Sequence, residues 1–372
     1  MYSYYFIGDF MKKMDYNLLF VVVLLSIFGL LMVYSSSNIW ADYKFHDSFH
    51  YLKYQLLFFL VGVVFVFLIS NIHYRFYYTH ANHILLFSLI LLILVLIPGI
   101  GSIRNGSRSW FGIGSFGIQP SEAAKISILI FTSKYLSRSN SYINNYIKGV
   151  FPILFMTFLL FGLIMLQPDL GTGTILFLSV IALLFIAGVN LKFFLCGGFI
   201  GLFGLIGLII IAPYRLQRIT SFLDPWKDPL GTGFQMIQSL YAIGPGGLLG
   251  EGYLNSIQKH FYLPEPQTDF IFSIITEEFG FMGAIIVVFL FSIILYRGIF
   301  IATHCKDLFG KYLSFGIVFQ LIFQALLNLM VVVGLIPVTG VTLPFLSYGG
   351  SSLLVSMVSV GILLSISRNL TY

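Results

Sequence analysis

Charged residues are scarce in this sequence. Lys, Arg, Asp and Glu make up 9% of its 372 residues, whereas hydrophobic residues make up 58%, and the mean hydropathy is +0.95. A soluble domain carries roughly a quarter charged residues. The composition therefore excludes a soluble globular protein and predicts one that crosses a membrane several times.

Cysteine is nearly absent as well. Cys196 lies in an apolar stretch and Cys305 beside a predicted cytoplasmic loop, so we expect no disulfide, no thiolate metal site and no redox motif. The histidines are dispersed, without the helical spacing of zinc ligands. The net charge of +6 is spread over many loops and forms no basic stripe, which favours anionic lipid and excludes nucleic acid as a partner.

Long apolar stretches dominate the chain, and roughly ten of them are long enough to cross a bilayer. They are continuous rather than alternating, which predicts helices and not a barrel. We expect an all-α polytopic membrane protein, a single domain over residues 1–372. The predicted transmembrane spans are 17–36, 53–71, 82–99, 120–136, 149–166, 172–190, 193–212, 270–296, 312–335 and 350–367.

The distribution of basic residues predicts which side each loop faces. Lys12 and Lys13 precede the first span, and basic residues beside a span favour the cytoplasm. An even number of spans returns the C-terminus to that side, so the short tails, 1–16 and 368–372, are expected to be cytoplasmic. The long loop at 213–269, between the seventh and eighth spans, is then extracellular, and its aromatic residues favour an ordered cap.

Asp269 is the strongest candidate for a chemical role. It stands where the long loop runs into the eighth span. The positive end of the helix dipole favours the ionised carboxylate and apolar surroundings favour the neutral acid, so Asp269 could exchange a proton near neutral pH as a general base. The alternative is that Asp269 caps the helix.

Other charged residues lie within or beside the spans. Glu122 and Lys125 share one face of the fourth span, either as a structural ion pair or as the wall of a polar cavity. Asp169 precedes the sixth span and either caps it or serves the site. Glu277 and Glu278 lie deeper in the eighth span, so at least one of them must face a polar partner.

These residues suit a transfer reaction with an anionic leaving group. One base would deprotonate a hydroxyl, while cations hold a pyrophosphate. The residues alone equally allow a transporter of a lipid or solute with a charged site.

Short motifs follow one another along the chain, at 105–110, 119–122 with Lys125, 167–172, 238–239, 242–247, 263–265, 268–272, 277–278, 337–340 and 343–352. Each is weak evidence alone, but in this order they resemble the SEDS family of bacterial cell-wall proteins, which includes RodA, FtsW and SpoVE. The likeness spans nearly the whole chain. The residues at 215–220 and 241–247 are more similar to the SpoVE and FtsW branch than to RodA.

The resemblance implies a peptidoglycan glycosyltransferase that polymerises lipid II into glycan strands at the outer face of the bacterial plasma membrane. It implies that Asp269 deprotonates the GlcNAc 4-hydroxyl of the acceptor lipid II, which then attacks and inverts the anomeric carbon of the donor. For Ser347 and Ser351 a structural role is an equal alternative to substrate contact. The residues assigned to substrate binding are Arg108, Glu122, Lys125, Asp169, Arg215, Gln238, Ser239, Ser347 and Ser351.

The resemblance also implies a divalent cation, Mg²⁺ or Mn²⁺, with Asp269 as the candidate ligand, and no organic cofactor. It implies a class B penicillin-binding protein, a transpeptidase, as the partner, within the division, elongation or sporulation machinery. The sequence leaves two alternatives to polymerisation: a lipid II translocator (flippase), and a non-catalytic scaffold of the cell-wall synthesis complex.

A stripe of glycines marks the seventh span. Gly198, Gly201, Gly204 and Gly207 recur every three residues. Such stripes usually allow close packing against a partner helix, which we expect here. The alternative is a groove for the polyprenyl tail of a lipid substrate.

Overall fold

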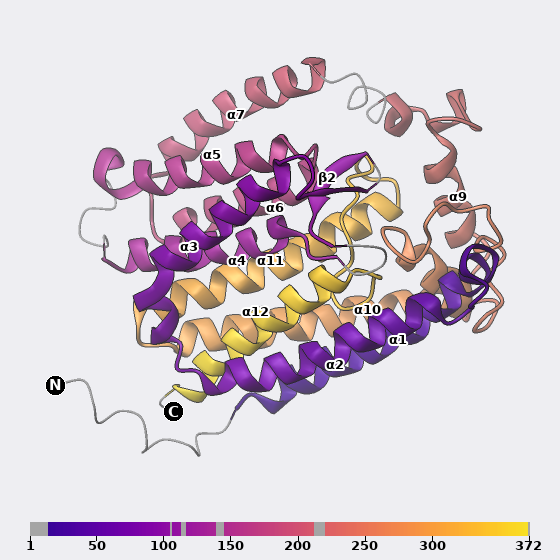
Figure 1. Cartoon of the computed structure of the whole chain (residues 1–372), viewed down its shortest axis with the longest axis horizontal. Helices are drawn as coiled ribbons and strands as arrows, with labels where there is room; N and C mark the ends of the chain where they lie inside the picture. Colours follow the sequence, from indigo (N-terminus) through magenta and orange to yellow (C-terminus); the bar gives the residue numbers. More distant parts are fainter. Residues whose placement is uncertain (1–13, 105, 113–116, 139–144, 212–219, 371–372) are drawn as a thin grey trace.

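Figure 1 shows the computed structural model of the chain, which describes residues 14–104, 106–112, 117–138, 145–211 and 220–370. The described part is mainly helical. Its elements are α1 (Tyr16–Phe45), α2 (His50–Asn71), α3 (Arg75–Leu96), β1 (Ser102–Arg104), β2 (Ser107–Trp110), α4 (Pro120–Arg138), the π-helix η2 (Tyr146–Val150), α5 (Phe151–Met165), α6 (Leu170–Ile186), α7 (Leu191–Ile211), the 3-10 helix η3 (Pro225–Lys227), α9 (Phe234–Ile243), α10 (Ile271–His304), α11 (Leu308–Val332) and α12 (Gly350–Arg368).

A helix stands at each predicted span within the described residues, so the polytopic helical fold is confirmed. Seven of these helices are long and apolar enough to cross a membrane: α1, α2, α3, η2 with α5, α10, α11 and α12. The helix α6 is apolar but shorter, and α4 carries four charged residues, so the exact number of crossings stays a prediction.

Several helices begin at an aspartate that accepts hydrogen bonds from the free N–H groups of the first turn. Asp15 accepts from Leu18 N at 3.0 Å at the start of α1. Asp307 does the same for α11, accepting from Gly310 N at 3.3 Å. Such caps fix where a helix starts, because the first N–H groups have no partner inside the helix.

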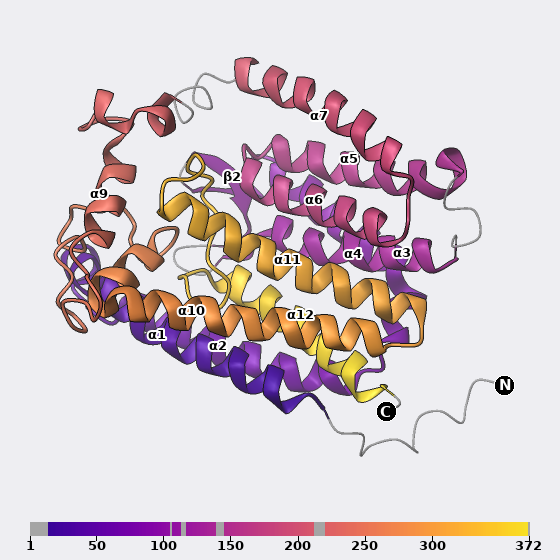
Figure 2. The same cartoon turned by 180° about the vertical axis from the view of Figure 1, so that it is seen from behind.

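The helices α4 and α11 form the centre of the bundle. The helix α4 packs against α3, α6 and α11, and α11 packs against α4, α6 and α10 (Figures 1 and 2). Most side chains of α4 are buried, including Glu122, Lys125 and Lys134. These three charges of α4 therefore face protein rather than lipid, as the cost of charge in a bilayer requires.

The helix α7 lies at the edge of the bundle, apart from α5 in both views (Figures 1 and 2). A Cβ added at Gly198, Gly201, Gly204 or Gly207 would meet no heavy atom within 4 Å among the described residues. The expected close packing of this stripe is therefore wrong for the described part of this chain.

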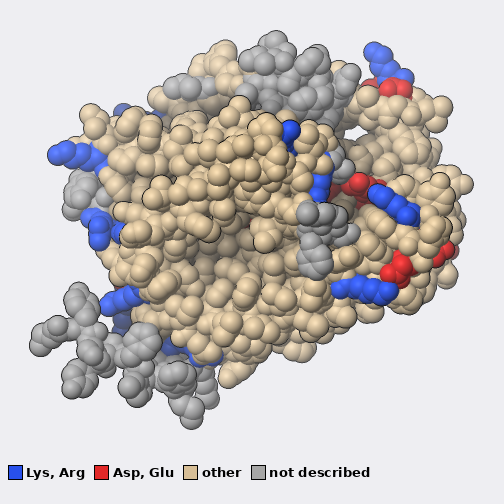
Figure 3. Space-filling view, viewed as in Figure 1, with Lys and Arg blue, Asp and Glu red and all other residues tan. Residues whose placement is uncertain are grey.

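The beginning of α1 and the end of α12 lie together. Asp15 donates its backbone N–H to Ser367 Oγ at 3.2 Å, and its carboxylate binds Arg297 of α10 at 2.7 Å. On the face shown in Figure 3, a broad uncharged band separates the Lys and Arg of this end from charged side chains toward the opposite end. This distribution is typical of a protein surrounded by lipid at its middle.

The helix α10 is interrupted at Gly280, whose φ of 62° and ψ of −158° are not helical. The break frees backbone groups, which the long loop satisfies: Phe281 N donates to Gly247 O at 2.9 Å, and Gly252 N donates to Glu278 O at 3.0 Å. The segment before the break is thus a short half-helix that begins directly after Asp269 and is held by the long loop.

Candidate active site

Asp269 is half-buried and lies two residues before Ile271, the first residue of α10. The N-cap of α10 is Phe270, one residue later, and no side chain of that N-cap makes a capping hydrogen bond. Asp269 therefore lies one position outside the place where a capping residue belongs. The position of Asp269 therefore weakens the interpretation that it caps α10.

The backbone of Asp269 is held from α11. Asn328 donates its Nδ2 protons to the carbonyl oxygen of Asp269 at 2.7 Å and to that of Val341 at 2.7 Å. Gly340, with φ 73°, comes so near that a Cβ added to it would lie 3.6 Å from Asp269 Oδ2. The carboxylate thus stands against the backbone that joins α11 to α12.

That backbone, residues 333–349, is called the α11–α12 loop. It is irregular, and its second half is buried: Leu343, Phe345 and Leu346 are 1%, 2% and 0% exposed. A Cβ added at Gly29, in the middle of α1, would clash with the carbonyl oxygen of Phe345, so the loop descends deep between the helices. Non-helical backbone at membrane depth is tolerated only inside protein or along a water-filled cavity.

Glu122 and Lys125 form a buried ion pair that reaches the same loop. Their side chains lie 3.0 Å apart and are 7% and 1% exposed. Lys125 Nζ also donates to Gln324 Oε1 at 2.7 Å, and Gln324 Nε2 donates to Thr342 O at 3.0 Å. Gln324 of α11 therefore links the ion pair to Thr342 of the α11–α12 loop.

Asp169 caps α6 and contacts the segment that leads into α4. Its carboxylate accepts from Thr172 N and from Gln119 Nε2, each at 3.0 Å. Burial raises the pKa of Asp169, and the hydrogen bonds from Thr172 oppose that rise. Arg108 is half-buried on β2, in a hairpin that reaches the same turn through a hydrogen bond from Ser107 to the carbonyl of Gln167.

The predicted serines are held inside the protein. Ser347 Oγ accepts from Leu343 N at 2.8 Å and closes a turn of the α11–α12 loop. Ser351 Oγ accepts from Gln119 N at 3.0 Å and donates to Gly117 O at 2.9 Å. Both side chains are buried, at 4% and 2% exposure, so each has an evident structural role.

Gln238 and Ser239 lie on α9, which covers the end of α11. Ser239 donates to Val332 O at 2.8 Å and lies 2.8 Å from Ser273 Oγ in the first turn of α10. Gln238 beside it is half-buried. Arg215 lies outside the described residues. The predicted site residues in the described part thus lie around the α11–α12 loop, at the ends of neighbouring helices and on the β1–β2 hairpin.

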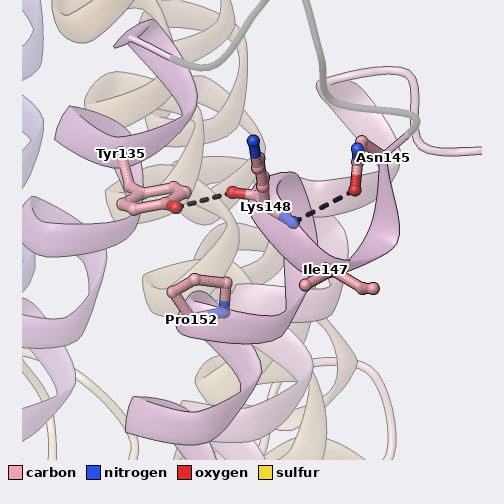
Figure 4. Close-up of a pocket in the computed structure, with 5 residues that line it drawn as sticks. All are labelled: Tyr135, Asn145, Ile147, Lys148 and Pro152. Atoms are coloured by element: carbon pink, nitrogen blue, oxygen red, sulfur yellow. Dashed lines mark hydrogen bonds between the residues drawn. The ribbon is translucent and has the colours of Figure 1, made fainter.

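No group of three or more His, Cys, Asp or Glu side chains that could hold a metal ion occurs among the described residues. A pocket of about 660 Å³ lies elsewhere, at the far end of α4 from Glu122, where Tyr135 donates to Lys148 O at 2.6 Å (Figure 4). None of the predicted site residues lines this pocket.

The sequence interpretation missed two site residues, Gln324 and Asn328. Both are buried amides on α11, and Gln320 precedes them at the same spacing of four residues. An amide every fourth residue in an otherwise apolar helix places a polar line on one face. That spacing was the available signal.

Comparisons with known proteins are consistent over nearly the full chain. The family model described as "Cell cycle protein", for FtsW, RodA and SpoVE, matches residues 15–372. Stage V sporulation protein E of Bacillus subtilis is 52% identical over 97% of this chain and 99% of its own length. A probable peptidoglycan glycosyltransferase FtsW of Trichlorobacter lovleyi is 43% identical over 97% of this chain and 94% of its own length.

Two solved structures share the fold. A chain of a peptidoglycan synthase complex that coordinates polymerization and crosslinking has a TM-score of 0.80 and 32% identity, covering 96% of this chain and 99% of that one. The rod shape determining protein RodA of Thermus thermophilus has a TM-score of 0.71 and 28% identity, covering 98% of this chain and 100% of its own. The greater likeness to SpoVE and FtsW than to RodA is confirmed.

Proposed function

Because the chain belongs to the FtsW, RodA and SpoVE family of cell cycle proteins, we propose that it is a peptidoglycan glycosyltransferase that polymerises lipid II. It is a multi-pass membrane protein. The descriptions of its relatives name the cell cycle, sporulation and rod shape, which supports a role in division, sporulation or elongation.

One observation carries the catalytic assignment: Asp269 is fixed between α11 and a buried irregular loop. Its backbone carbonyl accepts a hydrogen bond from Asn328, and its carboxylate lies against Gly340 of the α11–α12 loop. A general base must be held within hydrogen-bond reach of the proton that it removes, which requires such a fixed position.

Asp269 acts as the base in the proposed reaction. It accepts the proton of the GlcNAc 4-hydroxyl of the acceptor, and that oxygen attacks the anomeric carbon of the donor lipid II. The bond from that carbon to the undecaprenyl pyrophosphate breaks as the new β-1,4 bond forms, so the anomeric centre inverts. The pyrophosphate departs as an anion and needs no strong acid.

The charged residues take different parts in this scheme. Arg108 lies on the β1–β2 hairpin, which contacts the turn between α5 and α6. It binds the departing pyrophosphate by charge-assisted hydrogen bonds. Glu122 and Lys125 neutralise each other and hold Gln324 against the α11–α12 loop, so they shape the wall of the site. Asp169 positions the connection into α4 through Gln119.

A divalent cation, Mg²⁺ or Mn²⁺, fits Asp269 as its protein ligand. Mg²⁺ is commonly held by one or two carboxylates together with water and substrate phosphates, so a larger protein cluster is not required. When bound, it would neutralise charge on the pyrophosphate.

The proposed partner is a class B penicillin-binding protein that crosslinks the new strands. The structural likeness to a synthase complex that coordinates polymerization with crosslinking supports this pairing. We place both termini in the cytoplasm and Asp269 at the outer face, where strands are assembled, because Lys12 and Lys13 precede α1.

Purified protein with its crosslinking partner, lipid II and Mg²⁺ or Mn²⁺ should produce glycan ladders on a gel. Asp269→Ala should abolish them, since no other described carboxylate directly precedes the α10 half-helix. Ladders that survive in Asp269→Ala would contradict the base assignment. Lipid II movement across liposomes without polymer would favour a translocator, and no product in either assay would favour a scaffold.

A further inference from the structure

Three buried amides lie at four-residue intervals along α11. Gln320, Gln324 and Asn328 are 3%, 2% and 1% exposed. Residues four apart share one face of a helix, so the three form a polar line inside the bundle. Gln324 and Asn328 donate to backbone carbonyls, whereas Gln320 Oε1 is buried without a hydrogen-bond partner among the described residues.

Asn328 uses both protons of its amide on backbone carbonyls. One acceptor is Asp269 O and the other is Val341 O, each at 2.7 Å from Nδ2. Only the NH₂ group of the amide can donate to two carbonyl oxygens, which settles the orientation of the side chain. The side chain therefore joins the residue before α10 to the α11–α12 loop.

Gln324 reinforces this link one turn earlier. It donates to Thr342 O at 3.0 Å and accepts from Lys125 at 2.7 Å. Consecutive carbonyls of the loop, those of Val341 and Thr342, are thus held by consecutive turns of α11. The loop stretch beside Gly340 cannot shift without breaking these bonds.

We propose that Asn328 is a positioning residue for Asp269 in the polymerase reaction, holding the carboxylate where it can reach the acceptor hydroxyl. The inference rests on the proposed function. Asn328 fixes Asp269 by binding the backbone carbonyl of Asp269. It fixes the neighbouring part of the α11–α12 loop by binding the carbonyl of Val341. It acts through Asp269 and does not itself bind the substrate.

Asn328→Leu removes both donors at similar volume. We expect kcat for lipid II polymerisation to fall about 10- to 100-fold with KM for lipid II unchanged, because a displacement near 1 Å has effects of that order. Asn328→Ser, too short to reach both carbonyls, should show the same loss if Asn328→Leu does not fold. In an Asp269→Glu background, whose carboxylate is already displaced, the loss should be smaller.

Gln320→Leu is the matched control, since it removes a buried amide from the same face of α11 two turns away. It should retain kcat, and melting temperatures of all variants in complex with the partner verify folding. A folded Asn328→Leu with unchanged kcat, a loss no larger than that of Gln320→Leu, or a loss of equal size in the Asp269→Glu background would overturn the inference. An active Asp269→Ala would overturn the assignment of Asp269 as the base, and a parent protein that makes no glycan ladders would overturn the proposed function instead.

Discussion

At the scale of single residues, Glu277 and Glu278 show how acids are accommodated deep in the bundle. Glu277 accepts from Ile257 N at 2.7 Å and from Ser256 Oγ at 2.5 Å. Glu278 binds Lys259 Nζ at 3.1 Å. The prediction that at least one of them faces a polar partner is confirmed for both. Both carboxylates therefore bind residues of the long loop.

Lys259→Met should destabilise the protein strongly. It leaves the Glu278 carboxylate, 0% exposed, without its cation, and breaking a buried pair from one side costs about 3–5 kcal/mol. The measurement is the thermal unfolding of the protein in detergent. Adding Glu278→Gln should recover much of the loss, and a Lys259→Met protein as stable as the parent would mean that the pair contributes little.

Asp169 offers a test of structural against chemical roles. Burial raises its pKa because desolvation penalises the charged carboxylate, so a neutral amide at this position avoids that penalty. Asp169→Asn should keep stability and polymerisation, since its oxygen can still accept from Thr172 N. Asp169→Ala should lose about 1 kcal/mol with the cap. Inactive but stable Asp169→Asn would instead indicate a direct role for its charge.

At the scale of elements, the interruption of α10 couples a half-helix to the long loop. The break at Gly280 needs a backbone conformation that L side chains rarely adopt. The loop backbone approaches so closely that a Cβ there would clash with Leu248 and Gly250. Glycine is therefore required at this position by both conformation and space.

Gly280→Ala should lower stability by about 1–3 kcal/mol from backbone strain alone. Crowding against the loop adds to this, so we also expect faster proteolysis between 247 and 259. Thermal unfolding and limited proteolysis measure the two effects. Gly162→Ala is the control, because Gly162 of α5 has no neighbour within 4 Å in the described part, and alanine there favours the helix. Equal behaviour of both variants would contradict the role of Gly280.

At the scale of the whole molecule, the proposed orientation in the membrane rests on the distribution of basic residues and is directly testable. Leu230 and Ile147 are 89% and 78% exposed and lie on opposite predicted sides. In a protein with Cys196→Ala and Cys305→Ala, an impermeant maleimide should label Leu230→Cys in intact spheroplasts, but Ile147→Cys only after permeabilisation. The reverse pattern would invert the proposed orientation.

The helices were predictable from the sequence because long apolar stretches leave few other structures in a bilayer. Their ends were less so: α1 continues to Phe45, beyond the predicted end at 36, and its last turns contact the long loop through Trp40 and Tyr43, which pack edge-on against Phe261. The ion pair of Glu122 and Lys125 was predictable, because residues three apart share one face of a helix. The clamp of Asn328 on Asp269 was not, since it joins residues 59 positions apart through a backbone carbonyl that any residue carries.

The contact between Asp15 and Ser367 joins positions 352 residues apart, and α2 has α12 as its main packing partner. The ribosome delivers these partners far apart in time. The first two helices must therefore wait in the lipid, with part of their packing surface open, until α12 arrives. This seam of the bundle can close only after α12 has been synthesised.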